Sequence, residues 1–255
     1  MFNLPTPKLG DITAITITAP DLDKSLAYYQ RLGFAQVMRA DFPFPWIHIT
    51  DGALLIMLRK SDTPYIALTY YAKDIAASVQ AVEAAGISFT ETPAATDMVK
   101  KYVFQSPDGL NISLVNIMDG FQRPPGPTML TMPQEDYFNP EKYVNKITGL
   151  YGEFAQPVKD LEQSIPFWES IGFIILSKTP GAQPWAILSD GLSVVGLHQT
   201  TEFDYPVITY FAADMKAKIE ALKQNGLDNF IEHSPGNIIL TTPEQQKINL
   251  FNWGM

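Results

Sequence analysis

The chain has 255 residues and a net charge of −9, with 46% hydrophobic residues, 18% charged residues and no cysteine. This composition is that of a globular protein long enough for two small domains, and the lack of cysteine excludes disulfides and thiolate metal sites. The negative charge argues against nucleic acid or an anionic membrane as a partner, and without a long apolar segment or a signal-peptide pattern we expect a cytoplasmic protein.

The first predicted elements form a recognisable unit. Isoleucine and threonine alternate over residues 15–18, which predicts a half-buried strand. Asp21 then provides an N-cap side chain for an amphipathic helix that ends at Gly33. The pair Asp51-Gly52, between two apolar segments, predicts a hairpin turn. The expected order is therefore βαβββ.

This unit recurs along the chain. Residues 20–34 align with residues 159–173 at an offset of 139, and the same offset places Trp46 on Trp185. Residues 69–86 align with residues 209–226 at an offset of 140. Each half contains the unit twice, so we predict an α+β protein made of four βαβββ modules by duplication.

Two further features follow from the repeat. We expect the modules to pair into two domains, residues 1–117 and 147–255, joined by residues 118–146, a linker with five prolines. In the third module, Pro166 falls two turns into the helix if Asp160 is the cap. A cap at Ser164 avoids this conflict, because it places the proline in the first helical turn.

The four modules, the Asp-Leu helix starts, the Gly-Phe helix exits and the late strand SPDGLNISLVNI at residues 106–117 resemble the vicinal oxygen chelate superfamily. This group includes glyoxalase I, bleomycin-resistance proteins and extradiol dioxygenases. The resemblance implies two tandem domains with cup-shaped mixed sheets. It also implies metal ligands that project into each cup from the first and last strands of the modules.

When residues are counted along the family's pattern, neither cup has the ligands for a metal cofactor, and we predict none. On the first strands the family's ligand stands seven residues before the Asp of the Asp-Leu pair. The first half offers Ala14, Ile56, Ala67 and Ser113 at the matching positions, and the second offers Glu153, Val195, Val207 and Asn249. One carboxylate and one amide fall short of the donors that a catalytic divalent metal needs. The three histidines, His48, His198 and His233, fall in different segments, and we expect no shared site among them.

The candidate site residues come from the same count and from the alternation of side chains between the two faces of a strand. Glu153 lies in an apolar strand, where a buried carboxylate acts as a general base, pairs with a cationic ligand or is simply held by structural hydrogen bonds. Asn249 and Ser113 are polar groups suited to orient a ligand, or to bond across strands. Tyr71 and Phe211 are candidates for the cup lining or for the core. The sequence leaves open which face of the sheet carries Trp46 and Trp185.

Two main hypotheses follow. The first is a metal-free binding protein for a small molecule, cationic or aromatic, that works in the second cup, where Glu153 and most of the net negative charge lie. The alternative is an enzyme of the same superfamily, either a metal-independent lyase or isomerase with Glu153 as base or a dioxygenase-like protein. A scaffolding role and a homodimer are also compatible with the duplication.

Overall fold

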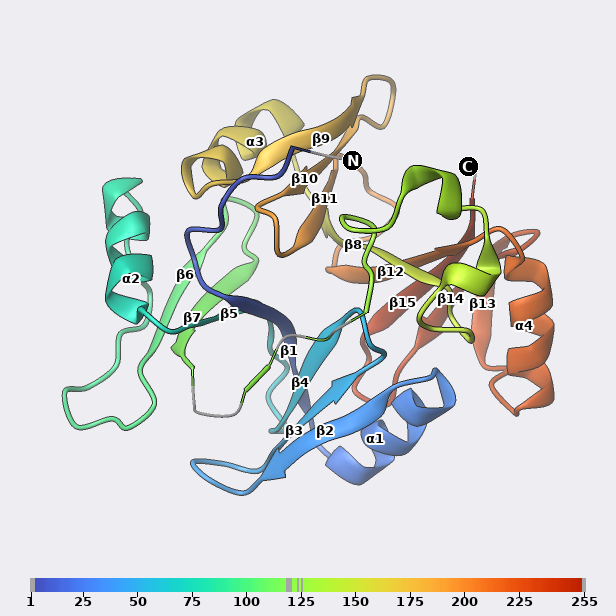
Figure 1. Cartoon of the computed structure of the whole chain (residues 1–255), viewed down its shortest axis with the longest axis horizontal. Coiled ribbons are helices and arrows are strands. Elements are labelled where there is room, and N and C mark those ends of the chain that lie inside the picture. The colour runs from blue at the N-terminus through green and yellow to red at the C-terminus, as the bar shows by residue number, and fades with distance from the viewer. Residues whose placement is uncertain (1–2, 118–120, 123, 125, 254–255) are drawn as a thin grey trace.

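A computed structural model describes residues 3–117, 121–122, 124 and 126–253, and its strands form two mixed sheets (Figure 1). The first sheet has the order β2-β3-β4-β1-β5-β7-β6, and the second has the order β13-β14-β15-β12-β8-β11-β10-β9. The strands of the first sheet are β1 (Ile12–Ala19), β2 (Ala35–Ala40), β3 (Trp46–Thr50), β4 (Leu55–Lys60), β5 (Ile66–Ala72), β6 (Lys101–Gln105) and β7 (Asn111–Asn116). Those of the second are β8 (Leu150–Pro157), β9 (Ile174–Thr179), β10 (Trp185–Ser189), β11 (Val194–His198), β12 (Val207–Ala212), β13 (Phe230–Ser234), β14 (Asn237–Thr241) and β15 (Lys247–Asn252).

One α-helix follows the first strand of each module: α1 (Leu22–Arg31), α2 (Ile75–Ala84), α3 (Leu161–Ser170) and α4 (Met215–Gln224). The strand order of the first module, β2-β3-β4-β1, is repeated by β9-β10-β11-β8 in the third. In both, the first strand pairs in parallel with the last, and in both halves the first strands of the two modules pair antiparallel. The predicted α+β class and the duplication are confirmed.

The helix starts follow the capping prediction with one correction. The Asp21 side chain accepts hydrogen bonds from the backbone N–H groups of Asp23 and Lys24. The Asp160 side chain accepts the equivalent bonds at the start of α3, the helix that contains Pro166. The predicted cap at Ser164 is wrong: α3 begins at Leu161 and keeps Pro166 inside. The Ser164 hydroxyl instead donates to Asp108 Oδ2 in the first half at 2.5 Å, and so stabilises the contact between the halves.

The second module departs from the βαβββ pattern. Its helix α2 is followed by residues 87–99, which form an isolated bridge between Glu91 and Val103 but no regular strand. This segment contains Pro93, which has no backbone N–H for a sheet ladder. The module is therefore βαββ, and its extra segment is free to cover one side of the first sheet.

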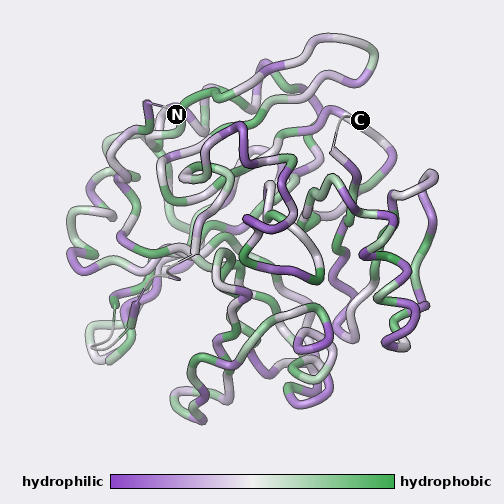
Figure 2. The backbone as a smooth tube through the Cα atoms, turned by 45° about the vertical axis from the view of Figure 1, so that its right-hand side comes forward, coloured by the Kyte–Doolittle hydropathy of each residue, from purple (hydrophilic) through white to green (hydrophobic). Residues whose placement is uncertain are grey.

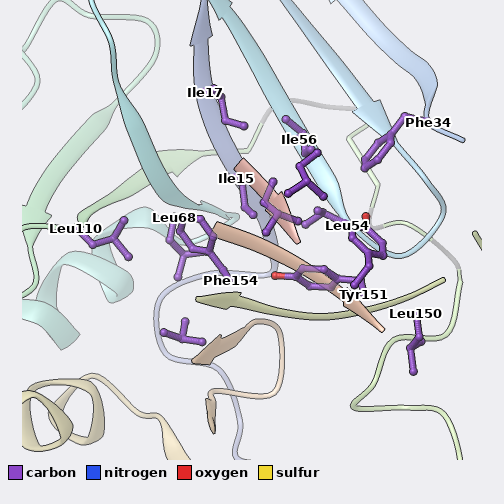
Figure 3. Packing of buried hydrophobic residues seen from close by; sticks show 14 of the residues in the cluster. Ile15, Ile17, Phe34, Leu54, Ile56, Leu68, Leu110, Leu150, Tyr151 and Phe154 are labelled. Atoms are coloured by element: carbon purple, nitrogen blue, oxygen red, sulfur yellow. The ribbon is translucent and has the colours of Figure 1, made fainter. Parts of the chain in front are cut away.

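The faces of the two sheets that carry the most apolar residues share one core. Figure 3 shows Ile15 and Leu68 of the first sheet with Tyr151 and Phe154 of the second in this core. Residues 118–146 also contribute to it, because Tyr143 of this linker is buried in the same cluster. The linker includes two short 3₁₀-helices, Gln134–Asp136 and Pro140–Lys142.

Hydrophobic and hydrophilic residues alternate along the backbone instead of forming long uniform segments (Figure 2). Among the described residues, no helix is long and apolar enough to cross a membrane. The alternation has a consequence for the sheets, because it gives each of them one apolar face and one face with polar groups.

Candidate functional site

The polar face of the first sheet contains a cavity of about 850 Å³. We call this face the first cup and define it by Thr16 on β1, Met57 on β4, Thr69 on β5 and Ser113 on β7, all of which line the cavity. The turn at residues 42–44 and the segment at residues 91–99 provide further lining. Strands of the first sheet thus form the floor, and two irregular segments form the sides.

Strand pairing decides which residues face this cavity. Ile15 pairs with Ile56 across β1 and β4, and both are buried in the shared core. Thr16 and Met57, one residue further, pair on the opposite face and line the cavity. The predicted ligand position Ile56 is therefore wrong, because successive residues of a strand point to opposite faces.

Hydroxyl groups on the floor bond to one another. The Oγ1 atoms of Thr16 and Thr69 are 2.7 Å apart, and the Tyr65 hydroxyl is 3.0 Å from the Ser113 hydroxyl. Burial raises the pKa of Tyr65, so its phenol keeps its proton at neutral pH. The floor can therefore both donate and accept hydrogen bonds.

An aromatic cluster lines one side of the cavity. The His48 ring lies 4.7 Å from the rings of Trp46 and Phe121 and 5.6 Å from Tyr71, centre to centre. Its Nε2 is 2.9 Å from the Tyr71 hydroxyl. Burial lowers the pKa of His48 to about 4, which keeps the imidazole neutral at pH 7. The cluster is an uncharged surface against which a flat apolar group can stack.

The equivalent face of the second sheet is the second cup, defined by Glu153 on β8, Gly196 on β11, Thr209 on β12 and Asn249 on β15. These four strands are neighbours in the order β15-β12-β8-β11, and Thr209 pairs with both Asn249 and Glu153. Glu153 is 5% exposed, and its Oε1 lies 3.0 Å from His198 Nε2. Its carboxylate occupies the space that a side chain at Gly196 would fill. A glycine at this position therefore makes the contact between Glu153 and His198 possible.

Three buried acceptor atoms in the second cup have no hydrogen-bond partner among the described residues. They are Glu153 Oε2, Thr209 Oγ1 and Asn249 Oδ1. Buried polar atoms are normally bonded, so this group is suited to a ligand or water that donates hydrogen bonds. The described residues contain no cluster of three or more His, Cys, Asp or Glu that could hold a metal ion. Glu153 with His198 alone does not match the two-histidine, one-carboxylate set of non-haem iron sites.

The structure divides the predicted site residues between the two cups. Tyr71 and Ser113 line the first cavity. Glu153 and Asn249 lie in the second cup, with Thr209 between them. Phe211 also belongs to the second half and stacks on Trp253, with ring centres 4.9 Å apart. Their roles in binding or catalysis stay predictions.

Several residues of these sites were not identified from the sequence. His48, Met57 and Arg59 line the first cavity, and His198 contacts Glu153. The strand Leu55–Lys60 begins with four apolar residues, so its sequence shows no alternation that would have placed Met57 on the cavity face. The sequence left open which face of the sheet carries Trp46, and the structure places it in the lining of the first cavity. Trp185 stacks on His198, with ring centres 6.4 Å apart.

Comparison with known proteins agrees with this architecture. Residues 11–114 match the family model of the Glyoxalase/Bleomycin resistance protein/Dioxygenase superfamily. A search of curated proteins gives no match.

Several solved structures share the fold over nearly the whole chain. The 2,3-dioxygenase LapB from Pseudomonas sp. KL28 is 15% identical, with a TM-score of 0.59 over 98% of this chain and 94% of that one. Homoprotocatechuate 2,3-dioxygenase from Arthrobacter globiformis is 14% identical, with a TM-score of 0.62 over 98% and 81%. The Mn(II)-bound glyoxalase from Novosphingobium aromaticivorans is 19% identical, with a TM-score of 0.59 over 96% and 82%. Residues 11–114 thus belong to the glyoxalase, bleomycin resistance protein and dioxygenase superfamily, and both halves of the chain have its vicinal oxygen chelate fold.

Proposed function

We propose that this protein binds a small, partly aromatic molecule in the first cup, without a metal ion. The observation that supports this proposal is the cavity itself. At about 850 Å³ it is large enough for a molecule of two or three rings. Its aromatic cluster provides a stacking surface, and its hydroxyl groups provide a few fixed polar contacts, which is the usual composition of a small-molecule site.

The position of the binding site differs from the expectation based on charge. The net negative charge and Glu153 favour the second cup, and that prediction stays untested. The cavity lies in the first cup, with walls from residues 42–44 and 91–99. Enclosure matters more than net charge for an apolar ligand, because the apolar area removed from water provides most of the binding free energy.

A matched pair of substitutions tests the proposal. Val115 lines the first cavity, and Phe251 holds the equivalent position beside Phe211 in the second half. A panel of bicyclic aromatic compounds would be screened by thermal shift and followed by isothermal titration calorimetry. We expect compounds that bind the natural protein to lose affinity at least about tenfold with Val115→Trp, which fills the cavity, and to keep it with Phe251→Trp.

Two results would contradict the proposal. One is a panel in which no compound binds. The other is binding that Val115→Trp leaves intact while Phe251→Trp abolishes it, which would place the site in the second cup. Native mass spectrometry of freshly purified protein gives an independent measurement, since a bound small molecule adds mass to the intact chain.

The second candidate function is catalysis by the second cup. The contact between Glu153 and His198 favours it, because a carboxylate bonded to an imidazole forms an acid–base pair. We propose proton abstraction from a carbon next to a carbonyl, with Glu153 as the base. Deuterium incorporation into hydroxyketones in D₂O, followed by NMR, tests this activity. Exchange that persists with Glu153→Gln, or no exchange with any hydroxyketone, would exclude it.

The remaining expectations concern the state of the protein in the cell. We propose a cytoplasmic location, and a homodimer remains compatible with the duplication. Cell fractionation tests the location, and sedimentation equilibrium tests the homodimer.

A further inference from the structure

Arg59 introduces a positive charge into the first cup. It lies on β4 in register with Trp46 on β3 and Thr18 on β1, and it lines the cavity. Its guanidinium is centred 4.2 Å from the centre of the Phe44 ring. This cation–π contact holds the guanidinium over the ring but does not neutralise its charge.

The other charged groups of the cavity have partners. Arg39 is paired with Asp23, and Lys101 with Glu91. Asp97 accepts a hydrogen bond from the backbone N–H of Ala94. Arg59 forms no ion pair within the described part of the chain, and its buried Nε has no hydrogen-bond partner there. A buried donor without a partner costs free energy, so a ligand that accepts its hydrogen bond has an advantage.

Polar groups beside Arg59 add to this advantage. Burial raises the pKa of Tyr65, and the positive charge of Arg59 acts in the opposite direction. The Tyr65 hydroxyl, 3.0 Å from Ser113, lines the same cavity. A guanidinium, a phenol and aromatic rings in the lining of one cavity match a molecule with one anionic group and an apolar body.

We propose that the ligand of the first cup is an aromatic carboxylate whose carboxylate group binds Arg59 and whose ring lies against the cluster of Trp46, His48 and Phe121. This inference rests on the proposed function of the first cup. A single negative charge suits the site better than a phosphate dianion, because the carboxylate of Asp97 lines the same cavity, forms no ion pair among the described residues and repels additional negative charge.

Two isosteric probes test the charge. 2-Naphthoate and 2-naphthamide have the same ring and nearly the same shape, but only the first is an anion. By isothermal titration calorimetry at pH 7.5, we expect the natural protein to bind the acid about 10- to 100-fold more tightly than the amide. We expect Arg59→Met, which keeps most of the apolar stem, to remove this preference, and Arg59→Lys to retain part of it.

Arg39 provides the matched control, since it lines the same cavity but is paired with Asp23. Arg39→Met should leave the preference for the acid unchanged. If Arg59→Met does not fold, Arg59→Lys still tests the inference, because lysine keeps the charge but lacks the two-pronged geometry of the guanidinium.

The outcomes separate this inference from the proposed function. Equal binding of acid and amide by the natural protein, sensitive to Val115→Trp, would refute the carboxylate and leave the binding function intact. A preference for the acid that survives Arg59→Met would also refute it. If neither probe binds and the wider panel also fails, the proposed function of the first cup is itself wrong.

Discussion

The two halves of the molecule are nearly the same where they meet and different in their cups. Tyr70 donates to Asp190 Oδ2 at 2.6 Å, and Tyr210, at the equivalent position, donates to Asp51 Oδ2 at the same distance. The hydroxyl of Ser25 in α1 donates to Glu244, as the hydroxyl of its counterpart in α3 donates to Asp108. The contact between the halves thus has approximate twofold symmetry, like an isologous dimer within one chain.

The cups share the backbone but not the side chains. At the offset of 139, Ala14 corresponds to Glu153, Met57 to Gly196 and Arg59 to His198. In the first cup, the lining leaves room for a cavity in which Arg59 is a cation without an ion pair among the described residues. In the second, a carboxylate reaches across a glycine to a histidine. The core faces are fixed by packing against each other, whereas a side chain in a cup can change without disturbing that packing.

The largest predicted effect concerns the contact between the halves. Tyr70→Phe removes the described partner of Asp190 Oδ2, while Tyr210→Phe leaves Asp51 Oδ2 with Asn145 Nδ2 at 3.3 Å. We expect the free energy of unfolding to fall by about 3 kcal/mol for Tyr70→Phe and by about 1.5 kcal/mol for Tyr210→Phe, because a buried acceptor left without a donor costs more than a lost bond. Urea denaturation measures both. Equal losses would mean that Asn145 does not compensate.

The next effect depends on pH and separates the cups by their histidines. The pKa of His48 is about 4 in the folded protein and 6.5 without burial. As the pH falls below 6.5, the unfolded chain takes up a proton that the folded one refuses until about pH 4. The stability present above pH 6.5 is therefore lost over this range. At pH 4.5 we expect this to cost about 2.5 kcal/mol relative to pH 7.5.

The comparison of variants isolates this contribution from other titrating groups. His48→Phe keeps an aromatic ring and removes the proton site, so its loss of stability between pH 7.5 and pH 4.5 should be smaller by about the same 2.5 kcal/mol. His198→Gln changes the histidine of the second cup and should retain the loss due to His48. If His48→Phe loses as much stability as the natural protein over this range, His48 is not the group responsible.

The third prediction exchanges one feature between the cups. A methyl group added at Gly196 would overlap Oε2 of Glu153 and displace it from His198. We expect Gly196→Ala to lower the free energy of unfolding by about 1.5 kcal/mol, the usual cost of overpacking. In a Glu153→Ala background, which reproduces Ala14 of the first half, the same change should cost less, because only His198 Nε2, 2.8 Å from the added methyl group, then has to shift. A double-mutant cycle with chemical denaturation measures this coupling, and its absence would contradict the contact.

The sequence predicted the scaffold much better than the sites. The repeat and the Asp21 cap follow from local patterns, and the structure agrees with them, whereas the cap predicted at Ser164 lies at Asp160. The strand that contains Ile56 was assigned the wrong face, because the register of a hairpin depends on its turn and a shift of one residue reverses every side chain. Tyr71 was a candidate for the cup lining, but the wall formed by residues 42–44 could not be predicted, since no periodic pattern gives the path of this segment.

The Glu153 contact shows a second limit. Glu153 was identified from its place in an apolar strand, but its partner His198 is 45 residues away and on another strand. What brings them together is the missing side chain at Gly196. A glycine inside a strand signals a close approach, but not the identity of the group that approaches.

The smallest predicted effect concerns a pair of charges that both halves repeat. Asp23 pairs with Arg39 in the first half, and Glu162 pairs with Lys178 at the equivalent positions of the second. The acidic side chains are 73% exposed in both pairs, so water and salt screen the attraction and holding two long side chains together costs entropy. We expect Asp23→Asn and Glu162→Gln to leave the free energy of unfolding unchanged within error at 150 mM NaCl. Their recurrence then reflects the shared backbone geometry of the modules and not a contribution to stability. A loss of stability in either variant that disappears in 1 M NaCl would show instead that the pair stabilises its half through charge.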